Sequence, residues 1–115
     1  MLTACMHFKR NGMSKSLLDT QKGICFRCGR YGVTEKHHIM QGVANRRLSE
    51  QDGLWVYLCP DCHNRPPNGV HFNPKNALWL HRIGQEAYES KMAQNGLNEA
   101  EARQAFMRRY GRNYL

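Results

Sequence analysis

The stretch "LCPDCHN", residues 58–64, carries a Cys-x-x-Cys pair, and "ICFRCGR", residues 24–30, carries another. Each pair can offer two thiolates to one tetrahedral Zn²⁺, and two pairs complete its ligand shell. The sequence therefore predicts a structural zinc site made by Cys25, Cys28, Cys59 and Cys62. The alternative interpretations of these cysteines are reduced thiols packed in the core or a redox pair. The βαβ pattern that accompanies a redox pair is absent.

A closed four-thiolate site has no open position for water or substrate, so it accounts for folding and not for activity. The chain has 115 residues, which fits one domain with a modest core, and a structural metal commonly stabilises such domains. The fifth cysteine, Cys5, is expected to be a free thiol.

The charge of the chain is unbalanced, with 17 Lys and Arg against 9 Asp and Glu, a net charge of +8. This favours a polyanionic partner, either nucleic acid or an anionic membrane, although a basic bias can also occur without such a partner. No apolar run has the length of a membrane span, and the N-terminus lacks the pattern of a signal peptide. We therefore expect a cytoplasmic protein without a membrane partner.

The order of strand and helix signals predicts an α+β fold. "EKHHIM" (35–40) and "LWVYLC" (54–59) indicate strands, joined by a loop in which a helical turn can follow Val43. Asn73-Pro74 begins a helix that Asn95-Gly96 ends, and Asn98 with Glu101 begins a second helix that ends at Gly111. We divide the chain into a basic arm (1–22, with a short helix over 14–20), a zinc-stabilised domain (23–92) and a C-terminal helix (93–115).

The histidines cluster around the second cysteine pair. His37 and His38 are adjacent in a predicted strand, and His63 directly follows Cys62. A zinc that joins the two cysteine pairs would bring these segments together, which predicts a second metal site of imidazole type. Nucleases use such a site to polarise a phosphate, and a neighbouring imidazole can take a proton from water at neutral pH. The competing interpretation is a set of structural or surface histidines.

The order Cys-x-x-Cys, "HHI", loop, "LCPDCHN" resembles the HNH endonuclease family, in its branch that carries a zinc finger. The resemblance covers roughly Cys25 to His71, with a weaker likeness through the following helix to about Glu89. The stretches "GVANRRLSE" and "GVHFN" are also similar to small phage proteins of the recombination-nuclease type. The resemblance implies a ββα-metal fold, metal-dependent cleavage of DNA, and a phage or mobile-element origin.

Position by position, the resemblance implies that His37 binds the catalytic divalent ion and that His38 is the general base. His63 matches a second ligand of that ion, and His71 is chosen as the third in preference to His81. The ion would be one such as Mg²⁺, Mn²⁺ or Ni²⁺, in addition to the structural Zn²⁺.

The chain departs from the family at the asparagine that holds the base histidine in the correct tautomer. Leu54 stands at that position, and Asp52, Asn64, Asn73 or a backbone carbonyl are the candidates for its role. The prolines after His63 also imply that the family's helix begins late or is interrupted.

Three basic residues near the predicted site suit contacts to the DNA backbone, namely Lys36, Arg46 and Arg47. With these charges, the resemblance favours a metal-dependent HNH endonuclease that hydrolyses DNA phosphodiester bonds. The alternative is a non-catalytic zinc-finger DNA-binding or recombination-accessory protein, acting with a recombination protein partner.

Overall fold

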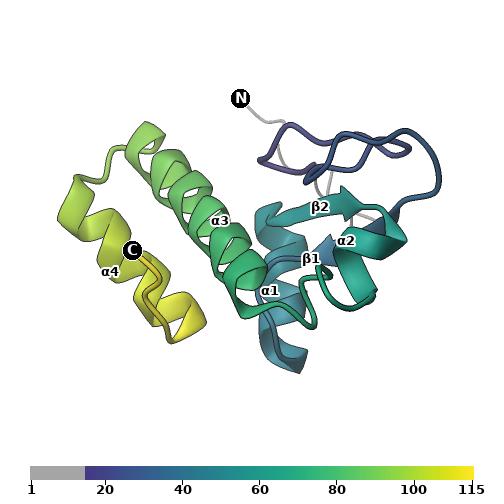
Figure 1. Ribbon diagram of the computed structural model, residues 1–115. Helices are drawn as coiled ribbons and strands as arrows, with labels where there is room; N and C mark the ends of the chain where they lie inside the picture. The colour runs from purple at the N-terminus through teal and green to yellow at the C-terminus, as the bar shows by residue number, and fades with distance from the viewer. Residues whose placement is uncertain (1–14) are drawn as a thin grey trace.

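The computed structural model describes residues 15–115, and within this range the chain forms two strands and four helices. In chain order these are β1 (Glu35–His38), α1 (Val43–Asp52), β2 (Trp55–Leu58), α2 (Pro60–Asn64), α3 (Pro74–Gln94) and α4 (Glu99–Tyr110) (Figure 1). The expected α+β class is confirmed. Cys5 and most of the predicted N-terminal arm lie outside the described residues.

The two strands form an antiparallel ribbon in which Glu35 lies opposite Leu58, Lys36 opposite Tyr57, His37 opposite Val56, and His38 opposite Trp55. Successive side chains of a strand point to opposite faces. Glu35 and His37 therefore share a face with Val56 and Leu58, which are fully buried. Lys36 and His38 occupy the other face, where the side chains are half-buried.

The segment between the strands is a helix of ten residues, α1, so the expectation of a loop was wrong. The sequence of α1 has only a weak apolar periodicity, and Ser49 is the only buried residue of this helix. Its Oγ donates to the carbonyl of Leu54 and accepts from the amide of Met40, which ties the helix to the residues just after β1 and just before β2. Gly53 ends α1 in the left-handed conformation, with φ of 74°.

The segment before the first cysteine pair lies along β2. Ser16 donates from Oγ to the carbonyl of Trp55, and the amide of Leu17 donates to that of Gly53. The amide of Tyr57 donates to Thr20 Oγ1. The part of the predicted helix that falls within the described residues, 15–20, is not helical, because its polar groups bond to β2 instead. The boundary proposed at residue 22 stays a prediction.

The interruption expected after the second cysteine pair is present. α2 ends at Asn64, since Arg65 precedes Pro66 and a residue before proline avoids the helical region. α3 then begins at Pro74, with the side chain of Asn73 accepting from the amide of Asn76, as the sequence predicted.

The C-terminal helices pack as a pair, and Figure 1 shows α3 between α4 and the ribbon. Asn98 and Glu101 form the predicted capping box at the start of α4, and Gly111 ends it. Tyr88 of α3 meets Phe106 and Tyr110 of α4 in a buried aromatic cluster. Among residues 15–115 we find no helix with the length and apolar character needed to cross a bilayer.

Candidate metal centres

The four cysteines of the two pairs meet at one point. Their Sγ atoms all lie within 4.8 Å of one another, and those of Cys28 and Cys59 are 3.9 Å apart. The edge of a tetrahedron with Zn–S bonds of about 2.3 Å is about 3.8 Å long. The donor set and its spacing therefore fit a structural Zn²⁺.

Local backbone geometry sets up this site. In the first pair, the amide of Gly29 donates to the carbonyl of Cys25, which closes a tight turn, and the amide of Phe26 donates to Tyr57 of β2. In the second pair, Cys59 directly follows β2 and Cys62 lies on α2, whose first turn is closed by the amide of His63. β2 thus joins the two halves of the site.

The thiols differ in how readily they ionise. Burial opposes ionisation of Cys25, but backbone amides, including that of Cys28, lower its pKa to about 6. Burial raises the pKa of Cys59 and Cys62, and the thiols of Cys25 and Cys28 raise both further. A divalent cation is what allows four adjacent thiols to ionise together.

A second group of side chains lies beside the first, formed by His37, His63 and His71. One ring nitrogen from each lies within 4.8 Å of the others, and Nε2 of His63 is 3.2 Å from Nε2 of His71. Two ligands of a tetrahedral ion with bonds of 2.0–2.1 Å are about 3.3 Å apart. The spacing of these imidazoles fits a divalent cation.

The two groups are connected through α2 and the turn that follows it. The amide of Val70 donates to the carbonyl of Cys62, and the amide of His71 donates to that of His63. These bonds bring His71 back across α2 from eight residues further along the chain. The fold of the cysteine site therefore also positions two of the three imidazoles.

Glu35 orients His63. Its Oε1 lies 2.7 Å from Nδ1 of His63, so that nitrogen donates its proton and Nε2 is left with a lone pair. A carboxylate in this position is the usual second partner of a metal-binding histidine. Because the side chains of a strand alternate, Glu35 and His37 lie on the same face of β1, where both serve this cluster.

The cluster is buried on one side and open on the other. Burial and the neighbouring histidines lower the pKa of His37 to about 3, and burial also lowers the pKa of His71. Neutral imidazoles are the form that binds metals. His71 is exposed, so the cluster is accessible from that side.

His38 does not belong to the imidazole cluster and lies on the opposite face of β1. Its Nε2 is 2.7 Å from Oε1 of Glu50, a residue of α1. Nζ of Lys36 contacts the same oxygen at 2.8 Å and also lies 4.1 Å above the ring of Trp55. No sequence pattern indicated Glu50, because this residue lies on the helix that was expected to be a loop.

Other sequence candidates have different roles. His81 stacks on Tyr114 with ring centroids 4.4 Å apart and is not one of the three clustered histidines. Asp52 accepts from Arg109 and from Tyr110 Oη, which joins α1 to α4. Arg46 and Arg47 are exposed on α1, whereas Lys36 is engaged with Glu50.

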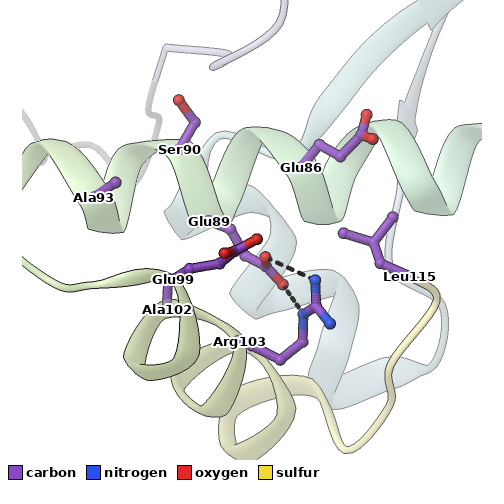
Figure 2. Close-up of a pocket in the computed structure, with 8 residues that line it drawn as sticks. All are labelled: Glu86, Glu89, Ser90, Ala93, Glu99, Ala102, Arg103 and Leu115. Carbon is purple, nitrogen blue, oxygen red and sulfur yellow. Dashed lines mark hydrogen bonds and ion pairs between the residues drawn. The ribbon is translucent and has the colours of Figure 1, made fainter.

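A surface pocket between α3 and α4 lies outside both clusters. Figure 2 shows three carboxylates in its lining, those of Glu86, Glu89 and Glu99. Its guanidinium, on Arg103, donates to Glu89 from Nε at 2.7 Å. A pocket with this charge does not suit a phosphate backbone.

Comparison of the chain with protein-family models, with curated proteins and with solved structures gives no match.

Proposed function

We propose that this protein is a metal-dependent endonuclease of the HNH type that hydrolyses DNA phosphodiester bonds. The observation that carries the proposal is that the two faces of β1 carry histidines in different surroundings. One face presents His37 to an imidazole cluster suited to a divalent ion, and the next residue, His38, stands apart from that cluster with a carboxylate partner.

A divalent ion at the cluster would supply charge that polarises a phosphate and stabilises the leaving oxygen. His37, His63 and His71 would hold it, because one ring nitrogen of each lies within 4.8 Å of the others. The closed cysteine site would have a structural role only. β1 ends at His38, so no strand continues beyond the two adjacent imidazoles. Both can therefore serve one phosphate at the end of the strand.

His38 would act as the general base. With Nε2 engaged by Glu50, its Nδ1 is the nitrogen that can accept a proton from the attacking water. Arg46 and Arg47 are exposed cations that suit contacts with phosphates, and Lys36 would contribute positive charge beside His38. The net charge of +8 favours association with a polyanion.

A second candidate is a non-catalytic zinc-finger protein that binds DNA or assists recombination. The four-thiolate site and the basic charge support it equally well, and the family's asparagine is replaced by Leu54.

A nicking assay on supercoiled plasmid with Mg²⁺, Mn²⁺ or Ni²⁺ separates the candidates. The endonuclease proposal expects nicking by the wild type and its loss in His38→Ala, with His81→Gln as a control from outside the cluster. Equal background cleavage by wild type and His38→Ala with every metal would reject it. Salt-sensitive DNA binding without nicking would then favour the second candidate, and absence of DNA binding would reject both.

A further inference from the structure

Glu50 stands at an unfavourable place for a helix. It lies in the last turn of α1, which has no basic residue, and the negative end of the helix dipole opposes a carboxylate there. Lys36 and His38, which contact its Oε1, are on β1 and not on α1. The position of this carboxylate is therefore not explained by helix stability.

The contacts of Glu50 define the proton on His38. Burial alone would raise the pKa of Glu50, but hydrogen bonds from Lys36 and His38 hold it below the usual value. An ionised carboxylate can only accept, so Nε2 of His38 is the donor. In a neutral imidazole, Nδ1 then carries the lone pair.

The carboxylate is also held firmly. Ser49, its neighbour in α1, bonds to backbone groups at the ends of both strands. Lys36 bridges the shared oxygen of Glu50 and the ring of Trp55, which lies opposite His38 in the ribbon. Glu50, which contacts His38, is thus held beside the ribbon by Lys36 and by the bonds of its neighbour Ser49.

We propose that Glu50 is a positioning residue for His38, holding its Nε2–H so that Nδ1 faces the reacting water. The proposal rests on the endonuclease function proposed above. It gives α1 a role: this helix supplies, from between the strands, the group that orients the base. Asp52 and Asn73, two of the residues considered from the sequence, are engaged elsewhere.

The test compares Glu50→Leu, Glu50→Gln and the control Asp52→Asn in the full-length, zinc-loaded protein. Asp52 is a carboxylate of the same helix that bonds to α4 instead of to His38, so its replacement reports on loosening of α1 alone. Nicking kinetics give kcat and KM. Long-range ¹H–¹⁵N correlations of the His38 ring show which nitrogen carries the proton and need no activity.

We expect Glu50→Leu to lower kcat about 10–100-fold with little change in KM, the usual size of effects from residues that orient a ligand or base. Glu50→Gln keeps an acceptor oxygen and should retain more kcat than Glu50→Leu. Asp52→Asn should keep wild-type kcat. In the spectra, the single tautomer of His38 should become a mixture in Glu50→Leu.

Wild-type kcat in Glu50→Leu, while His38→Ala is inactive, would overturn the role of Glu50 and leave the endonuclease intact. Equal losses in Glu50→Leu and Asp52→Asn would also overturn it. If the wild type does not nick, the proposed function fails, and an unchanged His38 spectrum in Glu50→Leu would reject the orientation as well. If Glu50→Leu does not fold, the spectra and kinetics of Glu50→Gln decide: wild-type kcat with an unchanged tautomer supports the proposal, and a lost tautomer with wild-type kcat overturns it.

Discussion

Replacing Glu35 by Gln should weaken metal binding by the imidazole cluster. Glu35 accepts from Nδ1 of His63 at 2.7 Å, which fixes the ring and makes Nε2 a better donor to a metal. Loss of such a partner typically costs about 10–100-fold in metal affinity, or about 1.4–2.8 kcal/mol. The side chain of Glu35 is 45% exposed, so water already screens the electrostatic interaction between its carboxylate and His63. We therefore expect a value near the lower limit, about tenfold.

The measurement is calorimetric titration with Ni²⁺, an ion that imidazole binds well, into protein whose cysteine site already holds zinc. Asp61→Asn is the matched control. Asp61 lies on α2 two residues before His63, and its carboxylate pairs with Arg30 and Arg65 rather than with a histidine. Both substitutions remove one negative charge close to the cluster, but only Glu35→Gln removes the partner of His63.

Two results would refute this reasoning. Wild-type Ni²⁺ affinity in Glu35→Gln would mean that the carboxylate does not orient the ligand. An equal loss in Asp61→Asn would mean that overall charge, and not the hydrogen bond to His63, sets the affinity.

Three further predictions concern stability and metal binding. Gly84→Ala should destabilise the fold by about 1 kcal/mol in chemical denaturation, because the new Cβ would lie 2.8 Å from Ile39 Cγ2. Such overpacking costs about 1–3 kcal/mol, which exceeds the gain of about 1 kcal/mol in helix propensity. Tyr110→Phe removes the hydroxyl that donates to Asp52 and should cost about 1–2 kcal/mol in the same assay, with zinc content unchanged. Metal analysis should find about one tightly held Zn²⁺ per chain, and its removal by a chelator should also abolish Ni²⁺ binding, since α2 carries ligands of both sites; retained Ni²⁺ binding would disprove that dependence.

Features with a local signal could be predicted from the sequence. The doubled Cys-x-x-Cys spacing predicted four thiols at one point, and Asn73-Pro74 and Asn98 predicted the starts of α3 and α4. The position of His63 after Cys62 predicted its meeting with His37, because zinc binding by both pairs requires those segments to approach. His71, and not His81, lies with His37 and His63 in the structure, and its role as a metal ligand stays a prediction.

Features that depend on contacts across the fold were missed. α1 has almost no buried apolar face, and hydrogen bonds of Ser49 to the strands and of Asp52 to α4 hold it in place. Without that helix, nothing in the sequence brought Glu50 to His38. Their contact joins residues twelve positions apart through the ribbon, and no local pattern encodes it.

Because side chains alternate along β1, its function depends on the register in which it pairs with β2. A slip of the ribbon by one residue would move His37 to the half-exposed face and would put His38 against buried Val56. Both the ligand and the proposed base would be lost at once, although every residue would still be present. The connection between the strands carries Glu50, so its length must also keep this carboxylate beside His38. Relatives of this chain that share the site are therefore expected to keep the four-residue strand free of insertions.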